Sequence, residues 1–299
     1  MDSLEIQGGP ALRGDITISG AKNAALPLLA AGLMATDRLV LDNVPRLADT
    51  LSMEGLLGHL GVDVVRDGEQ VTMSGRATIF DAPYELVSKM RASVLVLGPL
   101  LARYGEARVS LPGGCAIGTR PVDLHIRAMQ ALGAVVELAD GYIQARARNG
   151  LQGGRIMFPM VSVGGTENAL MAAVLARGET EIVNAAREPE ITDLADCLNE
   201  KKKKIEGHGS DTIRVQGVDH LHVATHKVVA DRIEAGTFAI AAAMTNGDLT
   251  LHGAHERHLD ALVAVLRDTG ASVECAAGTI RVRGNGRPQA VDITTDPFP

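Results

Sequence analysis

The sequence predicts an α/β protein that repeats one βαβαββ module, and three observations support this prediction. One order of elements returns four times: a helix of small residues, an alternating strand, a polar turn, an amphipathic helix and two short strands. The strand position of Val64 returns at Val136, Ile205 and Val273, a repeat of roughly 70 residues. Hydrophobic residues make up 46% of the chain and aromatic residues only 2%, so we expect a core of small aliphatic side chains, as in packed α/β layers.

The elements of the four copies follow from their periodicity. The first helices are predicted at residues 21–35, 93–103, 167–177 and 234–244, and the strands after them at residues 38–42, 107–111, 179–183 and 248–252. The second helices, one of them at residues 122–132, end at Gly61, Gly133 and Gly270. The third copy instead has four lysines at residues 201–204, interpreted as a solvated helix end rather than a nucleic-acid contact. A fifth copy starts at Gln289, which predicts four complete modules and part of another.

Charge and cysteine content limit the classes of partner. The net charge of −7 favours small-molecule partners over nucleic acid or an anionic membrane surface. The three cysteines are odd in number and widely spaced, which is typical of reduced thiols in the cytoplasm and indicates neither a disulfide framework nor a zinc site. The first residues lack the basic start and apolar run of a secretory signal, so we expect a soluble cytoplasmic protein.

The longest departure from the repeat is the loop at residues 111–124, where the second copy carries an insertion that includes Cys115. Its glycines contribute nothing to a core, and a thiol in such a loop is exposed, with Arg120 near enough in sequence to favour the thiolate. An ordinary surface cysteine on a long loop fits the same residues equally well. Cys197 and Cys275 lie at helix and strand positions and are predicted to be core thiols.

The starts of the first helices form a second group of candidates. Lys22 opposes its own helix dipole unless a negative ligand binds there, although a lone lysine after a turn is usually just exposed. Arg91 and Arg232 occupy related positions and also fit structural ion pairs with Asp or Glu. Residues 161–166 offer backbone amides and a hydroxyl suited to a phosphate or a base. If the four helix starts converge, they surround an anionic ligand.

Other chemistries are disfavoured by the spacing of their motifs. His220, His222 and His226 have no carboxylate or thiol spaced to complete a metal site, so we expect no metal. The Walker loop, the nucleophile elbow of the Gly-x-Ser-x-Gly type and the dinucleotide-binding glycine turn are all absent from the sequence. A nicotinamide dehydrogenase is therefore disfavoured, and no cofactor is predicted.

Six segments together resemble a known family: Ile-Ser-Gly-Ala-Lys-Asn at 18–23, Leu-Pro-Gly-Gly-Cys at 111–115, Arg-Pro-Val-Asp-Leu at 120–124, Val-Ser-Val-Gly at 161–164, Ala-Arg-Glu-Pro-Glu at 186–190 and Asp-Arg-Ile-Glu at 231–234. Over its whole length the chain closely resembles the UDP-N-acetylglucosamine 1-carboxyvinyltransferase family, the enolpyruvyl transferases that begin bacterial peptidoglycan synthesis. The resemblance implies transfer of an enolpyruvyl group from phosphoenolpyruvate to the 3-hydroxyl of UDP-N-acetylglucosamine, with release of phosphate. Through cell wall biogenesis it also implies a role in cell shape and cell division.

The resemblance implies roles for individual residues. Cys115 would protonate the enolpyruvate carbon and can form a covalent adduct with it, while Lys22 and Arg120 would hold the phosphate and carboxylate of phosphoenolpyruvate. Asn23 would help to hold the reacting groups. The residues implied to bind the UDP-sugar are Arg91, Pro121, Val122, Asp123, Leu124, Val161, Ser162, Val163 and Gly164.

The family fold is an inside-out α/β barrel of six modules in two domains. It implies one domain of three modules at residues 22–229 and an incomplete second domain at residues 1–21 and 230–299. In the family, a candidate base and an arginine that contacts phosphoenolpyruvate come after the position of Pro299, so we expect little or no activity from the 299 residues alone. A further departure is Met160, which stands where some relatives carry lysine. Two alternatives stay open: a shikimate-pathway enolpyruvyl transferase, disfavoured by the cysteine loop, and a non-catalytic UDP-sugar-binding relative.

Overall fold

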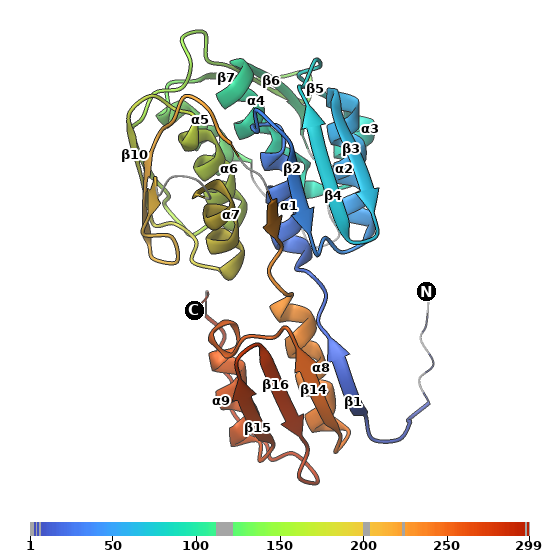
Figure 1. Ribbon diagram of the computed structural model, residues 1–299. Coiled ribbons are helices and arrows are strands. Elements are labelled where there is room, and N and C mark those ends of the chain that lie inside the picture. The colour runs from blue at the N-terminus through green and yellow to red at the C-terminus, as the bar shows by residue number, and fades with distance from the viewer. Residues whose placement is uncertain are drawn as a thin grey trace. The chain divides into compact units, whose positions relative to one another are not determined.

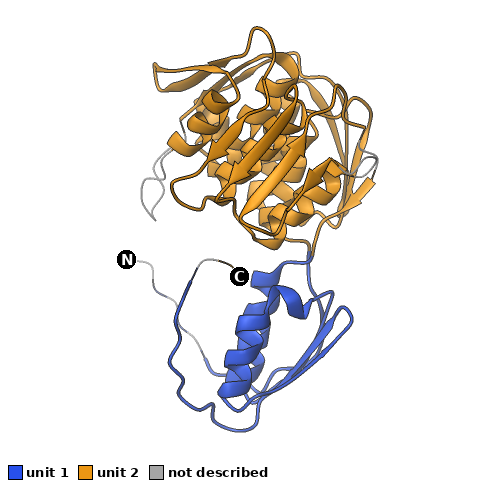
Figure 2. Ribbon diagram, turned by 90° about the vertical axis from the view of Figure 1, so that its left-hand side faces the viewer, with its two compact units in different colours: residues 1–19, 230–297, 299 blue, residues 20–229, 298 orange. Residues whose placement is uncertain are grey.

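The chain folds into two compact units, shown in different colours in Figure 2. The structure is a computed structural model, and it describes residues 3, 5, 7–111, 122–199, 204–222, 225–296 and 298. The larger unit is essentially residues 20–229, and the smaller unit combines residues 1–19 with residues 230–297. The chain therefore passes between the units twice, at Ser19–Gly20 and at Val229–Ala230.

The strands within the described residues form four sheets of four strands, and all four sheets share one order. An edge strand pairs in parallel with the first strand of a module, and that strand pairs with the antiparallel hairpin that ends the module. The sheets of the larger unit are β13-β2-β4-β3, β5-β6-β8-β7 and β9-β10-β12-β11, and that of the smaller unit is β1-β14-β16-β15. Their bounds in the larger unit are β2 Leu39–Asp42, β3 Val62–Asp67, β4 Gln70–Gly75, β5 Asp81–Ala82, β6 Glu106–Ser110, β7 Val135–Ala139, β8 Tyr142–Arg146, β9 Arg155–Met157, β10 Glu179–Val183, β11 Ile205–Glu206, β12 Thr212–Gln216 and β13 Thr225–Lys227.

In the larger unit the helices lie inside and the sheets lie outside (Figure 1). The first helices of its three modules pack against one another, and residues 24–31 of α1 are all buried. Small residues permit this close packing, and a Cβ on Gly98 of α4 would stand 2.3 Å from the side-chain oxygen of Asn168 on α6. The bounds are α1 Lys22–Ala31, α2 Ala48–Leu60, α3 Tyr84–Val87, the 3₁₀ helix η1 Arg91–Val96, α4 Leu97–Tyr104, α5 Asp123–Ala131, α6 Val163–Val174 and α7 Pro189–Asn199.

Modules one and four exchange their edge strands, which the repeat pattern did not predict. Strand β1 (Arg13–Thr17) precedes α1 in sequence but pairs with β14 of the smaller unit. Strand β13 precedes α8 in sequence but pairs with β2 of the larger unit. Strand β1 thus lies before Ser19–Gly20, within the smaller unit, and β13 lies before Val229–Ala230, within the larger unit, so each sheet keeps its four strands.

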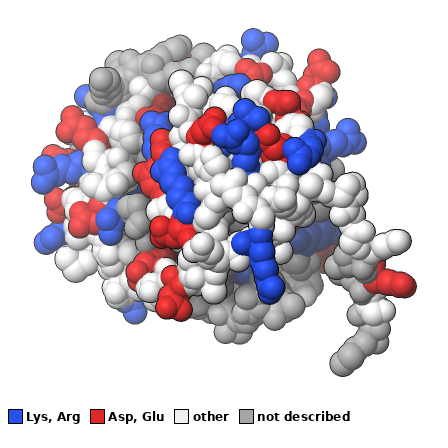
Figure 3. Space-filling view, turned by 90° about the horizontal axis from the view of Figure 1, so that it is seen from below, with Lys and Arg blue, Asp and Glu red and all other residues white. Residues whose placement is uncertain are grey.

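The smaller unit consists of one sheet covered on one face by helices. Its apolar face, with Leu249, Leu251, Ile280 and Val282, packs against the helices, and the opposite face carries charged side chains. Figure 3 shows cationic and anionic side chains interspersed on the molecule seen from below. Its elements are α8 Arg232–Met244, β14 Asp248–His252, η2 Glu256–His258, α9 Asp260–Asp268, β15 Ser272–Ala276 and β16 Thr279–Arg283. None of the described helices is long and apolar enough to cross a bilayer.

The predicted elements are present, with corrections to their bounds. The helix predicted at residues 167–177 spans Val163–Val174. The first helix ends at Ala31 rather than at residue 35, and the second module begins with η1 before α4 takes over at Leu97. Cys197 is buried as predicted, but Cys275, on the edge strand β15, packs against the core of the smaller unit and is only partly buried. Of the four lysines, Lys204 is exposed and residues 201–203 lie outside the described residues.

Candidate functional site

The residues predicted to bind substrates lie at the starts of four helical segments in the larger unit. Lys22 and Asn23 begin α1, Arg91 begins η1, and Val163 and Gly164 begin α6. Val122 caps the first turn of α5, in which Asp123 and Leu124 follow. Cys115, Arg120 and Pro121 lie outside the described residues. The structure thus brings together in one unit all of the predicted residues that it describes.

The start of α1 combines a cation with backbone amides. Lys22 Nζ lies 2.9 Å from Asp49 Oδ2 in the first turn of α2, and Asn23 is exposed beside it. No side chain caps α1, and no other described residue accepts a hydrogen bond from the amides of Lys22 or Asn23. Because helix starts carry partial positive charge, this end of α1 suits an anionic group.

The start of α6 is capped by its own sequence. Ser162 Oγ accepts a hydrogen bond of 3.1 Å from the amide of Gly165. Within the described residues, the amides of Val163 and Gly164 have no hydrogen-bond acceptor. Gly164 lies against the ring of His125, since a Cβ at this position would stand 3.3 Å from the imidazole Cε1 and 3.5 Å from Nε2. A helix start with two available amides therefore faces the first turn of α5.

A buried hydrogen-bond network centred on Asn168 joins these helix starts. The amide nitrogen of Asn168 donates to Val94 O and lies 3.0 Å from His125 Nδ1, and its oxygen accepts a 2.7 Å hydrogen bond from the amide of Gly98. Asn168 is fully buried and His125 nearly so. Burial lowers the pKa of His125 to about 4, against a smaller opposing effect of the Asp123 carboxylate. The imidazole is therefore neutral at physiological pH.

A buried carboxyl group lies next to Asn168 on α6. Burial, together with the nearby carboxylates of Glu190 and Glu188, raises the pKa of Glu167 to about 8. Glu167 therefore keeps its proton at neutral pH. The adjacent Thr166 accepts a 3.0 Å hydrogen bond from the amide of Ala186, which anchors the segment before α7 to α6. Glu167 and Asn168 could not be found from sequence, because a polar residue inside a helix of small residues belongs to no motif.

A left-handed turn follows the first strand in three of the four modules. Asn43 has φ 60°, Asn184 has φ 57° and Gly253 has φ 88°. The corresponding residue of the second module is Leu111, which does not adopt positive φ. The second module thus leaves the common path at the residue where the predicted insertion begins.

Of the four predicted helix starts, that of α8 is the one capped by a carboxylate. The carboxylate of Asp231 accepts hydrogen bonds from the amides of Ile233 and Glu234, so this start is already capped by an anion, and it belongs to the smaller unit. Arg91 forms no ion pair with any other described residue, so the predicted structural pairing does not apply to it.

Two of the three histidines considered as metal ligands form separate pairs with carboxylates. His226 Nε2 lies 2.9 Å from Asp193 Oδ1, and His222 Nδ1 lies 2.8 Å from Asp37 Oδ2. The other carboxylate oxygen of Asp193 accepts a hydrogen bond from the amide of Val229. Asp193 therefore fixes both β13 and the connection that leaves the larger unit.

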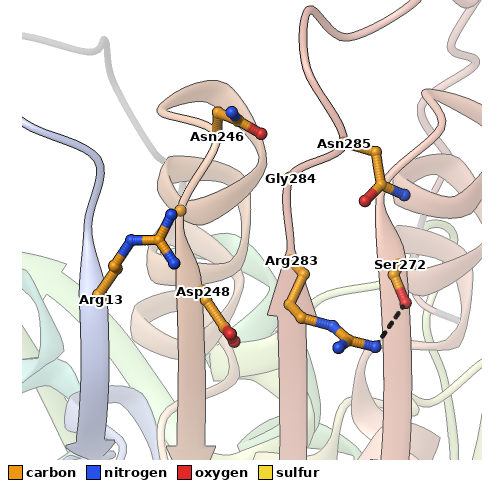
Figure 4. A pocket seen from close by; sticks show the side chains of 8 residues that line it. Arg13, Asn246, Asp248, Ser272, Arg283, Gly284 and Asn285 are labelled. Carbon is orange, nitrogen blue, oxygen red and sulfur yellow. Dashed lines mark hydrogen bonds between the residues drawn. The ribbon is translucent and has the colours of Figure 1, made fainter.

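A pocket of about 500 Å³ lies at one end of the sheet of the smaller unit (Figure 4). Arg13, Asp248, Arg283 and Ser272 are neighbours in register across its four strands. The cations are matched by anions, since Asp248 pairs with Arg281 and Arg283 pairs with Glu274. The pocket contains none of the predicted site residues and is the solvated end of a charged sheet face.

Comparisons with known proteins place the chain in a family. Residues 6–299 match the family described as EPSP synthase (3-phosphoshikimate 1-carboxyvinyltransferase). A UDP-N-acetylglucosamine 1-carboxyvinyltransferase of Gluconacetobacter diazotrophicus is 56% identical over 302 residues, which cover 100% of this chain and 72% of that protein. The protein of the same name from Sphingopyxis alaskensis is 54% identical over 308 residues, with the same coverage.

Solved structures show the same fold. The enolpyruvyl transferase NikO from Streptomyces tendae has a TM-score of 0.79 at 23% identity and covers 95% of this chain and 68% of its own. EPSP synthase from Acinetobacter baumannii has a TM-score of 0.77 at 19% identity and covers 96% of this chain and 68% of its own. These likenesses confirm the predicted α/β fold of enolpyruvyl transferase type. With its fold and its full-length sequence similarity, the chain belongs to the enolpyruvyl transferase family and, within it, to the UDP-N-acetylglucosamine 1-carboxyvinyltransferases.

Proposed function

We propose that this protein transfers the enolpyruvyl group of phosphoenolpyruvate to the 3-hydroxyl of UDP-N-acetylglucosamine and releases phosphate, the first committed step of peptidoglycan synthesis. The observation that carries the proposal is the 56% identity, over the whole chain, to a relative named for this reaction. The helix starts of the larger unit add a matching site, because both substrates are anionic. We also propose that the protein acts in the cytoplasm and without nucleic acid, in keeping with its net charge of −7.

The phosphoenolpyruvate site is proposed at the start of α1. Lys22 and Arg120 hold the phosphate and carboxylate through charge-assisted hydrogen bonds, and Asn23 helps to hold the reacting groups. The available amides of α1 add to this attraction. Lys22 exchanges its partner Asp49 for the phosphate when the substrate binds.

The UDP-sugar site is proposed at the starts of η1, α5 and α6. The amides of Val163 and Gly164 suit the diphosphate, and the hydroxyl of Ser162 holds the turn that presents them. The remaining residues proposed to bind this substrate are Arg91, Pro121, Val122, Asp123, Leu124 and Val161. Met160, which precedes this turn, has a side chain that is 64% exposed.

The reaction is proposed as an addition followed by an elimination. The sugar oxygen forms a bond to C2 of phosphoenolpyruvate while the Cys115 thiol donates its proton to C3, and the sugar hydroxyl loses its own proton. The C2–O bond to phosphate then breaks, and the phosphate leaves with the proton that the sugar hydroxyl lost. C3 loses a proton, which restores the Cys115 thiol, and the carbon–carbon double bond returns. In a side reaction the Cys115 sulfur itself adds to C2, which gives a covalent adduct.

The domain organisation remains a proposal of the same kind. We propose that residues 22–229 form a domain of three modules, and that residues 1–21 and 230–299 belong to a second domain. Support comes from the three related sheets of the larger unit and from the contribution of β1 to the sheet of the smaller unit.

Binding and adduct formation test the site without requiring turnover. We expect calorimetry to detect UDP-N-acetylglucosamine but not shikimate 3-phosphate, and intact mass to show a phosphoenolpyruvate adduct that is lost in Cys115→Ser. Phosphate release with both substrates then measures turnover by the 299-residue chain. Binding of shikimate 3-phosphate in preference to the UDP-sugar would refute the proposed function, and UDP-sugar binding without an adduct would favour a non-catalytic relative.

A further inference from the structure

The orientation of the buried Asn168 amide is set by two backbone groups. Its oxygen accepts from the Gly98 amide, which can only donate, and its nitrogen donates to the Val94 carbonyl, which can only accept. The nitrogen must therefore also face His125 Nδ1, at 3.0 Å. Because a side-chain amide nitrogen has no acceptor capacity, Nδ1 is the unprotonated nitrogen of the ring and Nε2 carries the hydrogen.

Two of the three partners of Asn168, Val94 and His125, lie within one turn of a segment that the proposed function assigns to the UDP-sugar. Val94 follows Arg91 in η1, and His125 follows Leu124 directly in α5. Asn168 itself lies one turn after Gly164 in α6, and the Cε1–Nε2 edge of the His125 ring contacts Gly164. A single side chain thus connects three segments that are otherwise far apart in sequence.

We propose that Asn168 is a positioning residue for the UDP-sugar: by three hydrogen bonds it holds the His125 ring in one tautomer against Gly164 and fixes the starts of η1, α5 and α6 relative to one another. The inference rests on the proposed function for the identity of the ligand. The network itself is independent of that identity. Since α1 and Lys22 take no part in it, the phosphoenolpyruvate site does not depend on Asn168.

The variant Asn168→Asp tests the network directly. Its carboxylate keeps the acceptor for Gly98 but removes the donor to Val94 and His125, and so draws a proton onto His125 Nδ1. Nitrogen NMR of labelled protein, with the His125 signals assigned by their loss in His125→Gln, should show the proton on Nε2 in the wild type and on Nδ1 in the variant. An unchanged tautomer would overturn the inference.

Binding measurements separate positioning from a general loss of stability. We expect Asn168→Asp to weaken UDP-N-acetylglucosamine binding at least tenfold and to leave phosphoenolpyruvate binding within twofold of the wild type. The matched control is Asn199→Asp, because the Asn199 side chain also donates to a backbone carbonyl, that of Ile205, and accepts from backbone amides. It should leave both affinities unchanged.

The remaining outcomes are also decisive. If Asn168→Asp loses the same affinity for both substrates, or binds the UDP-sugar normally, Asn168 has only a structural role. Either result would overturn the positioning role and leave the proposed function standing. Failure of the wild-type chain to bind UDP-N-acetylglucosamine would overturn the proposed function and, with it, the assignment of Asn168 to that ligand, whatever the tautomer of His125.

Discussion

The ammonium of Lys22 and the carboxylate of Asp49 form an ion pair of 2.9 Å between the first turns of α1 and α2. The two side chains remain 40% and 35% exposed, so water screens their attraction. Breaking such a pair costs at most about 1 kcal/mol. In the free protein Asp49 therefore pairs with Lys22, the proposed phosphate-binding residue, but this pairing is weak.

Asp49→Asn should strengthen phosphoenolpyruvate binding by roughly two- to fivefold, because the substrate no longer competes with a carboxylate for Lys22. The free energy of unfolding should change by less than about 1 kcal/mol. Calorimetry and urea denaturation measure the two quantities. Asp81→Asn is the control, since Asp81 pairs with Arg108 at the same distance and with similar exposure. Weaker binding by Asp49→Asn would mean that Asp49 orients Lys22 for the substrate.

Gly98→Ala should be strongly destabilising. The new Cβ would stand 2.3 Å from Asn168 Oδ1 and 2.6 Å from the Asn168 carbonyl oxygen, so α4 and α6 must move apart. Overpacking of this kind costs about 1–3 kcal/mol, and loss of the Gly98–Asn168 hydrogen bond adds to it. Gly55→Ala in α2 is the control: no atom lies within 4 Å of its Cβ position, so a gain of about 0.5–1 kcal/mol is expected. Equal melting temperatures for the two variants would contradict the close helix crossing.

Glu167 should make the protein less stable as pH rises. Its pKa is about 8 in the folded chain against an ordinary value of 4.5, so between these values only the unfolded chain releases the proton. Stability should fall by up to about 1.4 kcal/mol per pH unit in that window and level off above it. Glu167→Gln should remove this pH dependence and should be more stable than the wild type at pH 8. Glu137→Gln, at an exposed strand position, should leave the free energy of unfolding nearly unchanged at both pH values. Urea denaturation at pH 5 and 8 provides the measurement, and parallel curves for wild type and Glu167→Gln would exclude the buried acid.

Helix α8 should tolerate charge on one side. Ile233, Ile240 and Met244 recur at helical spacing and are 54%, 41% and 70% exposed. Ile240→Glu should therefore change the free energy of unfolding by no more than about 0.5 kcal/mol. The matched change Leu29→Glu, at a fully buried position of α1, should prevent folding, because it buries an unpaired charge. Circular dichroism with thermal melting distinguishes these outcomes, and a cooperative loss of structure in Ile240→Glu would show that this face is covered.

The sequence carries the local structure of this fold better than its long-range pairing. The helix and strand positions follow from periodicity, and the glycines that end α2 and α9 have positive φ, as expected for left-handed residues. The exchange of β1 and β13 left no trace in the pattern, because an edge strand of three to five residues looks the same whichever sheet it joins. The insertion in the loop at residues 111–124, by contrast, was visible in the sequence, and it begins at Leu111, where the second module diverges from the others.

The candidate site divides in the same way. Lys22, Arg91 and Gly164 were accessible from sequence because glycine turns and motif resemblance marked their helix starts. Asn168 and Glu167 were not, because their roles depend on which atoms of η1, α4, α5 and α7 lie beside α6 after folding. The cap that Asp231 provides to α8 was not predicted either, because the segment at residues 231–234 was recognised only through Arg232 and through its family resemblance.

Because of the exchange of edge strands, the larger unit is encoded by one continuous segment of the gene. Since β13 closes the sheet of the first module, one uninterrupted reading frame for residues 20–229 encodes every strand of its three sheets. Such a segment can be moved, duplicated or fused by joining two ends. The smaller unit has no such freedom: a gene for residues 230–299 alone would leave β14 without the neighbour that the N-terminal β1 supplies.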